Sequence, residues 1–285
     1  MDTWRERFGP PWYGVDAELL LRLEQHETRV DALGPGRELV DLGDALAVFD
    51  RADPDPFFNR LAAIRWPDDP GAFDARLDAA VAVFAARARQ PYVWLAPGFC
   101  EPGDIAERLR ARRFTDLEGG LVMILVRDPR TDPARPVPAG TVIERLDRGG
   151  PGDGAVDSRA AARLIGEAFG IGAERVQTLE VEILAGLDDP RIDVRLARTD
   201  GIPVAVGRRH GHDRISYLSA IGVGRGQEGR GLGEAVTRAL VDGALEAGDD
   251  PIYLGVYLEN RRAMALYRRL GFEILGGLSP DLIRL

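Results

Sequence analysis

The stretch that most constrains the fold runs from Tyr217 to Gly233, where an apolar segment ends in a glycine-dense turn. Glycine lets the backbone adopt conformations in which several N–H groups point toward one place. A helix is predicted to follow, from about Gly233 to Ala247, and the positive end of its dipole lies at the same turn. A strand, a glycine turn and a helix in this order predict an α/β fold with a binding site for an anion, most naturally a phosphate.

Two other phosphate-binding turns compete with this interpretation. A Walker loop needs a lysine beside its Ser or Thr, and this chain contains no lysine. Residues 224–229 match the dinucleotide pattern G-x-G-x-x-G and follow a predicted strand. A dinucleotide fold, however, builds several strand and helix units after this turn, whereas only residues 230–285 follow it here. A dinucleotide-binding oxidoreductase therefore stays as an alternative, and it predicts binding of NADH.

A second motif follows the turn in a fixed order and spacing. After Val223 come Glu228-Gly-Arg-Gly-Leu-Gly233, a predicted helix and a predicted strand over 252–256. Then comes Asn260-x-x-Ala-x-x-Leu-Tyr-Arg-Arg-Leu-Gly-Phe272. Over roughly residues 140–285 the chain resembles the GNAT (GCN5-related N-acetyltransferase) family, although that family usually has Gln or Arg where Glu228 stands. Two linked motifs in the right order are more specific than one glycine turn.

The resemblance implies a fold, a reaction and a set of site residues. The fold is α/β (α+β), with a mixed, mostly antiparallel sheet flanked by helices. The reaction is transfer of an acetyl group from acetyl-CoA to a primary amine by direct attack on the thioester. Tyr267 takes the position of the general acid, because a phenol with a pKa of ~10 is protonated at neutral pH. Its other interpretation is a core residue on one helix face. Gly222 fits a place where backbone and ligand approach closely. The residues implied in acetyl-CoA binding are Ile221, Gly222, Val223, Glu228, Gly229, Arg230, Gly231, Leu232, Gly233, Glu234, Asn260, Ala263 and Tyr267.

The sequence leaves the general base open. Many members of the family carry a glutamate on the central strand, but the predicted strand 215–223 contains no acidic residue. Tyr217 and Ser219 on that strand, or Glu180 and Glu182 on a preceding predicted helix, are the candidates. A CoA-binding regulatory module, or a pseudoenzyme without turnover, is therefore a second alternative.

Composition restricts the partners. A net charge of −9 argues against nucleic-acid and anionic-membrane binding and suits a cationic small-molecule amine. Cys100 is the sole cysteine, so it forms no internal disulfide, and three scattered histidines give no metal pattern. We expect His26, His210 and His212 at the surface. The sequence shows neither a signal peptide nor an apolar run of ~20 residues, so we expect a cytoplasmic protein. We also expect no metal, and either a monomer or a homodimer.

The chain length of 285 residues favours two domains. Four prolines between Asp128 and Pro138 predict a linker. The predicted division is 1–127 for a degenerate GNAT-like domain, 128–139 for a proline-rich linker and 140–285 for the acetyltransferase domain. The second domain is predicted to have the element order β-α-α-β-β-β-α-β-α-β.

A weak internal repeat supports a tandem protein. The predicted strand 92–95, helix 104–112 and strand 120–126 repeat the order found in residues 252–275, and Phe114 takes the place of Phe272. The first half has no glycine turn before its strand at residue 92. We therefore expect that it does not bind coenzyme A in the same way as the second half.

Overall fold

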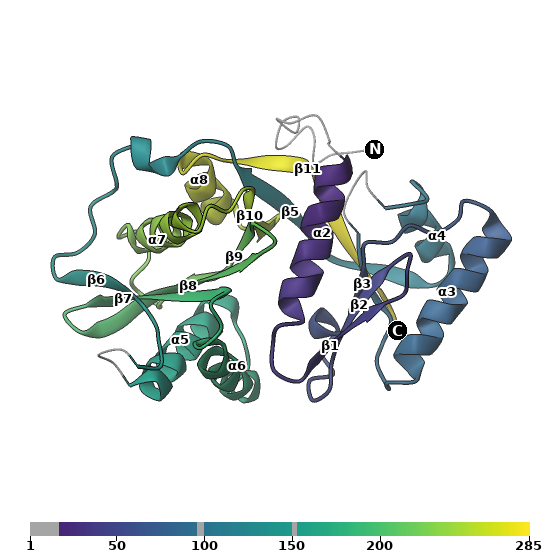
Figure 1. The fold of residues 1–285 in the computed structure, drawn as a ribbon, viewed down its shortest axis with the longest axis horizontal. Helices are drawn as coiled ribbons and strands as arrows, with labels where there is room; N and C mark the ends of the chain where they lie inside the picture. Colours follow the sequence, from purple (N-terminus) through teal and green to yellow (C-terminus); the bar gives the residue numbers. More distant parts are fainter. Residues whose placement is uncertain (1–16, 96–99, 150–152) are drawn as a thin grey trace. The chain divides into compact units, whose positions relative to one another are not determined.

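The computed structural model describes residues 17–95, 100–149 and 153–285 (Figure 1). The chain divides into two compact units. Unit 1 comprises Met1–Met123, Val256–Arg261 and Glu273–Leu285, and unit 2 comprises Ile124–Gly255 and Arg262–Phe272. The predicted division assigned residues 128–139 to a separate linker and all residues from 140 to 285 to the second domain. By contacts, the proline-rich stretch groups with unit 2 and the residues after Phe272 group with unit 1.

Unit 1 contains six strands in the order β1-β2-β3-β4-β11-β5. Its strands are β1 Arg37–Asp41, β2 Leu46–Asp50, β3 Arg60–Ala62, β4 Tyr92–Trp94, β5 Phe114–Leu125 and β11 Phe272–Arg284. Its helices are α2 Ala17–Asp31, the short η1 Pro56–Phe58, α3 Pro70–Ala85 and α4 Ile105–Ala111. The sequence did not predict β1, whose side chains are all at least partly exposed and show no clear apolar alternation.

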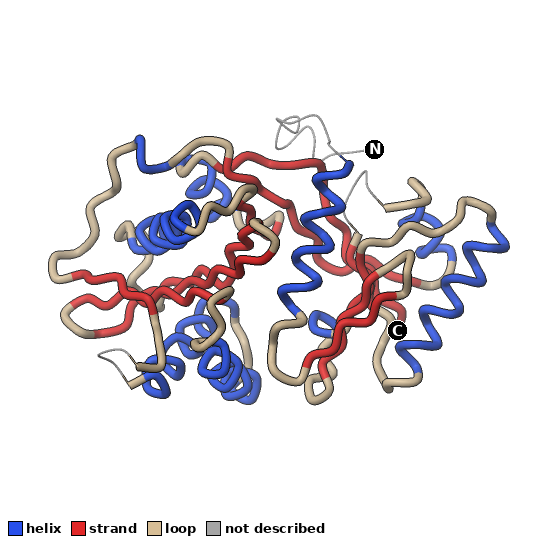
Figure 2. The backbone as a smooth tube through the Cα atoms, viewed as in Figure 1, coloured by secondary structure: helices blue, strands red, loops and turns tan. Residues whose placement is uncertain are grey.

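Unit 2 contains five strands in the order β10-β9-β8-β7-β6. Its strands are β6 Thr141–Arg145, β7 Ile192–Thr199, β8 Ile202–His212, β9 Ile215–Val223 and β10 Ile252–Tyr257. Its helices are η2 Pro129–Thr131, α5 Gly154–Phe169, α6 Ala173–Gly186, α7 Leu232–Glu246 and α8 Arg261–Arg269. Helices α5 and α6 cover one face of the β7–β8 region and α7 covers the other (Figure 2).

Both units repeat one supersecondary pattern. In unit 1, β3 and β4 are parallel and α3 connects them; in unit 2, β9 and β10 are parallel and α7 connects them. The other pairings with a described register are antiparallel, so the mixed, mostly antiparallel sheet predicted from the sequence is confirmed. The repeat supports a tandem architecture.

The starts of the two connecting helices differ. The side chain of Asp69 caps α3 by accepting from the N–H of Ala72 at 2.9 Å, and Pro70 has no N–H to offer. Helix α7 begins after Gly231 and has no side-chain cap. The anion-binding potential of a helix start is therefore occupied in unit 1 and available in unit 2.

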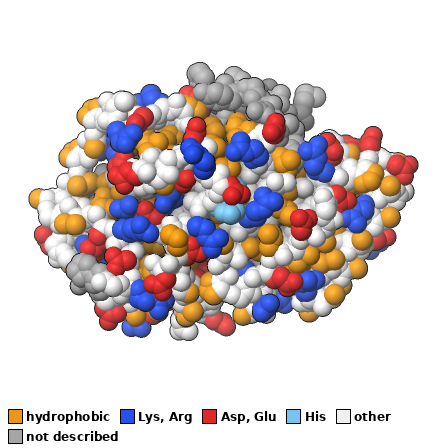
Figure 3. Space-filling view, in the orientation of Figure 1, with side chains coloured by type: hydrophobic (Ala, Val, Ile, Leu, Met, Phe, Trp, Pro, Cys, Tyr) orange, Lys and Arg blue, Asp and Glu red, His pale blue; other side chains and the backbone are white. Residues whose placement is uncertain are grey.

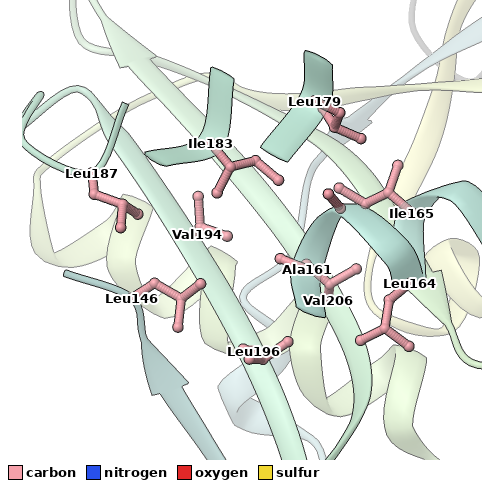
Figure 4. Packing of buried hydrophobic residues seen from close by; sticks show 11 residues of the cluster. Leu146, Ala161, Leu164, Ile165, Leu179, Ile183, Leu187, Val194, Leu196 and Val206 are labelled. Atoms are coloured by element: carbon pink, nitrogen blue, oxygen red, sulfur yellow. The ribbon is translucent and has the colours of Figure 1, made fainter. Parts of the chain in front are cut away.

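An apolar cluster forms the centre of the core between α5, α6 and the sheet of unit 2. Leu146, which follows β6, and aliphatic residues of β7 and β8 meet the facing sides of the two helices (Figure 4). Each buried Leu, Ile or Val contributes ~1.5–3 kcal/mol relative to an exposed position. This packing holds the sheet on which the candidate site is built.

Candidate functional site

Strand β9 is distorted next to Ile221 and Gly222, which the family resemblance implies in acetyl-CoA binding. Val206 of β8 lies opposite Gly222, and Arg208 lies opposite Ser219, so β9 carries one residue more than β8 between these pairs. Ala220 in this bulge has φ +52°, a left-handed conformation that costs a non-glycine residue ~1–2 kcal/mol. Bulges and such strained residues cluster beside functional sites.

On its other side, β9 leaves its neighbour. The described pairing with β10 runs from Ser216 to Leu218, whereas β9 continues to Val223. The backbone groups from Ser219 onward therefore have no β10 partner among the described pairs. Such groups can bond an extended ligand, as the sequence predicts for Ile221 and Val223.

The glycine turn presents a set of N–H groups at the start of α7. Gly226, Gly229 and Gly231 all have φ near +80°, a conformation that glycine adopts without strain. Among the described residues we find no acceptor for the N–H groups of residues 228–234. Because these donors coincide with the positive end of the helix dipole, they form a binding site for an anion.

Helix α8 and the end of β9 meet this turn at Gly233. A Cβ at Gly233 would lie 3.5 Å from Leu266 of α8 and 3.5 Å from Val223 of β9. The guanidinium Nη2 of Arg262 lies 3.6 Å from the corresponding position of Gly229. The turn, the strand end and α8, which carries Tyr267, thus come together at one place.

The Tyr267 side chain is 7% exposed and meets Phe272 edge-on, with ring centroids 6.0 Å apart. Burial raises the pKa of this phenol above its ordinary value. The described residues provide no hydrogen-bond partner for its hydroxyl. A core tyrosine normally has such a partner, so a neutral donor without one favours the acid role over a purely structural one.

The remaining predicted cofactor residues differ in how they are placed. Glu228 is exposed, and the Arg230 guanidinium bonds to the side chain of Gln227. Leu232 is buried, and Ala263 is partly buried on α8. Asn260 is exposed directly before α8.

Gly222 has a packing role that the sequence did not predict. A Cβ at this position would lie 2.8 Å from the Cβ of Ala168 and 3.5 Å from the carbonyl oxygen of Leu164, both on α5. Glycine is therefore required here because a helix approaches the strand. Close approach of a ligand is not needed to explain it.

The structure separates the four candidates for the general base. Glu180 is ion-paired with Arg159 at 3.1 Å, and Glu182 is buried and ion-paired with Arg175 at 2.8 Å. The Tyr217 ring stacks on that of Tyr253, with centroids 5.0 Å apart.

Ser219 has a buried hydroxyl, directly before the bulge, without a hydrogen-bond partner among the described residues. Of the four candidates, Ser219 therefore lies nearest to the distorted part of β9.

Two predictions about histidines were wrong. His26 and His210 are 2% and 6% exposed, because each lies on the inner side of its helix or strand, whereas His212 is partly exposed beside Asp213. In the described part of the chain no group of His, Cys, Asp or Glu side chains is arranged to hold a metal ion. Cys100 is buried and is not in a disulfide.

The face shown in Figure 3 carries acidic and basic side chains interspersed, with no large basic field. Searched over the described residues, the helices include none with the length and apolar character needed to span a membrane.

One basic residue near the turn, Arg262, was not predicted as a site residue. Arg261 and Arg262 begin α8, where a positive charge faces the positive end of the helix dipole and costs ~0.3–1 kcal/mol. A bound anion would reverse that cost. The signal was present in the sequence, since basic residues at a helix start break a local rule and such violations concentrate at functional sites.

Comparisons with known proteins agree with this geometry. A family model described as the acetyltransferase (GNAT) family matches residues 176–272. The N-alpha-acetyltransferase RimI of Mycobacterium tuberculosis is 31% identical over 121 residues, which are 36% of this chain and 74% of that protein.

Two solved structures match nearly the whole chain. A GCN5-related N-acetyltransferase from Kribbella flavida has a TM-score of 0.69 and 21% identity, covering 95% of this chain and 96% of that one. A tandem GNAT protein from the clavulanic acid biosynthesis pathway has a TM-score of 0.64 and 17% identity, covering 94% and 93%. These likenesses establish the fold of the chain.

Proposed function

Because the chain belongs to the GNAT family of acetyltransferases, we propose that unit 2 acetylates the primary amine of a small-molecule acceptor by direct attack on the thioester of acetyl-CoA. The family makes the chain an N-acetyltransferase with an amine acceptor. The observation that carries the proposal is the convergence of the glycine turn, the end of β9 and α8 at Gly233. The net charge of −9 favours a cationic acceptor.

In this proposal the backbone holds the donor. The N–H groups of residues 228–234 bind the pyrophosphate of acetyl-CoA, and Arg262 adds a positive charge beside them. Backbone groups of Ile221 and Val223, which have no described β10 partner, bond the pantetheine arm and the thioester oxygen. Because Glu228 is exposed, its carboxylate can point into water while its N–H faces the phosphate.

The chemistry then needs one proton at sulfur. The amine nitrogen attacks the thioester carbon, a C–N bond forms, the C–S bond breaks, and the nitrogen releases one proton to solvent water, from which Tyr267 is later reprotonated. Tyr267 donates its proton to the leaving sulfur, whose conjugate acid has a pKa of ~8.5 in a free thiol. A phenol is neutral at physiological pH and so holds the proton that it donates.

The test is Tyr267→Phe, assayed by release of free thiol and by acetyl-CoA binding. We expect kcat to fall about 10²–10⁴-fold, the usual contribution of a general acid, with little change in the acetyl-CoA Kd. Unchanged turnover would refute the acid role. Tyr92→Phe is the matched control, because that buried phenol donates to Asp281 in unit 1 at 2.8 Å. Loss of this hydrogen bond should lower the free energy of unfolding and leave kcat unaltered.

A further inference from the structure

Residues 127–136, most of which belong to the predicted linker 128–139, lie against α7 and the turn before it. Arg238 of α7 donates to the backbone oxygen of Pro129. At the other end, the carbonyl oxygen of Pro136 lies 2.7 Å from where a Cβ on Gly231 would stand. A side chain at Gly231 would therefore collide with this segment, so the glycine turn and residues 127–136 are in direct contact.

The same segment also contacts the end of α8. The Arg127 guanidinium donates to the carbonyl oxygen of Arg269 at 3.1 Å. The carbonyl oxygen of Arg127 lies 2.6 Å from the Cβ position of Gly271. Residues 127–136 thus bridge the two helices that flank the candidate cofactor site.

Glu234 lies at the centre of this bridge. Its side chain is 6% exposed, in the first turn of α7. The N–H of Arg135 donates to Glu234 Oε1 at 3.3 Å, and the guanidinium of Arg238 approaches the same oxygen at 3.3 Å. The guanidinium of Arg269, at the end of α8, lies 3.7 Å from Oε2. One buried carboxylate therefore joins the segment, α7 and α8.

We propose that Glu234 is a positioning residue for acetyl-CoA, and that residues 127–136 form part of the cofactor site as a brace behind the glycine turn. This inference rests on the proposed function. The brace holds the N–H groups at the start of α7 in their binding arrangement before the ligand arrives. Preorganisation of this kind raises affinity because less ordering remains for the ligand to impose.

The substitution Glu234→Gln tests the proposal, because a brace and simple charge repulsion predict opposite changes in acetyl-CoA affinity. A carboxylate near a pyrophosphate repels it, so Glu234→Gln should tighten binding if charge alone decided. If Glu234 acts by holding the brace, the same change should weaken acetyl-CoA binding about 5–150-fold, the usual size of coupling between linked sites. The direction of the change therefore discriminates between the two.

The experiment is calorimetric titration of acetyl-CoA into wild type, Glu234→Gln and Glu174→Gln. Glu174 is an exposed carboxylate in the first turn of α6 and undergoes the same change of charge outside the brace, so the affinity of Glu174→Gln should stay at the wild-type value. Unchanged or tighter binding by Glu234→Gln would overturn the inference. Failure of the wild type to bind would instead refute the proposed function.

A second measurement needs no variant, in case Glu234→Gln does not fold. Because coupling is reciprocal, acetyl-CoA must stabilise the docked segment as much as the segment stabilises acetyl-CoA. Hydrogen exchange of wild type should therefore slow across residues 127–136 when acetyl-CoA is added. Binding of acetyl-CoA with unchanged exchange in this segment would overturn the inference.

Discussion

Gly231 and Gly226 offer a matched pair for testing the structure of the turn. Both have a left-handed backbone, with φ +81° and +79°. A Cβ at Gly226 would meet nothing within 4 Å, whereas one at Gly231 would lie 2.7 Å from the carbonyl oxygen of Pro136. Alanine at either position therefore pays the same backbone cost, and the crowding applies at Gly231 alone.

The magnitudes follow from these two contributions. The left-handed conformation costs alanine ~1–2 kcal/mol at either position. Forcing a methyl group against backbone adds ~1–3 kcal/mol, the usual cost of overpacking. We expect Gly226→Ala to lower the free energy of unfolding by ~1–2 kcal/mol and Gly231→Ala by ~2–5 kcal/mol.

Urea unfolding followed by circular dichroism measures this difference. Tryptophan fluorescence is unsuitable, because all four tryptophans precede residue 95 and unit 2 contains none. Equal destabilisation by the two substitutions would refute the close contact between Gly231 and Pro136. It would also remove the basis for including residues 127–136 in the cofactor site.

Two further predictions concern buried charges. Asp193→Ala removes a carboxylate that is 2% exposed, lies 2.9 Å from the guanidinium of Arg195 and lies 4.0 Å from that of Arg209, so it should cost ~3–5 kcal/mol of unfolding free energy. The exposed control Asp188→Ala should cost less than ~1 kcal/mol, and similar losses from the two substitutions would contradict the role of the buried ion pair. For Asp50, burial alone would raise the pKa, but backbone N–H groups and Arg37 lower it overall. The stabilisation from the ionised Asp50 is therefore present above the ordinary carboxyl pKa of ~4 and is lost as the pH falls through the folded-state pKa. The difference in free energy of unfolding between wild type and Asp50→Asn should therefore shrink as the pH is lowered. A difference that stays constant with pH would refute this prediction.

Features that depend on neighbours along the chain could be predicted from the sequence. The apolar run into the glycine turn, and the periodic spacing of helix-forming residues around Tyr267, are local patterns. They gave the order of β9, α7, β10 and α8 with boundaries within a few residues. The repeated strand and helix order similarly led to the tandem fold.

Features set by distant contacts could not be predicted in this way. Prolines made residues 128–139 resemble a linker, but Arg238 and Glu234, about a hundred residues later, hold that segment on α7. The burial of His210 likewise follows from pairing between strands, which the polar residues around it conceal. The need for glycine at position 222 comes from α5, which the chain forms some fifty residues earlier.

The central claim is that the glycine turn of unit 2 binds acetyl-CoA, and titration of the purified chain with acetyl-CoA and with NADH tests it directly. We predict saturable binding of one acetyl-CoA per chain, because Asp69 and Pro70 occupy the corresponding helix start in unit 1. We predict no binding of NADH. Binding of NADH alone, or no binding of acetyl-CoA, would contradict the account. Two equivalents of acetyl-CoA per chain would contradict the assignment of the site to unit 2 alone.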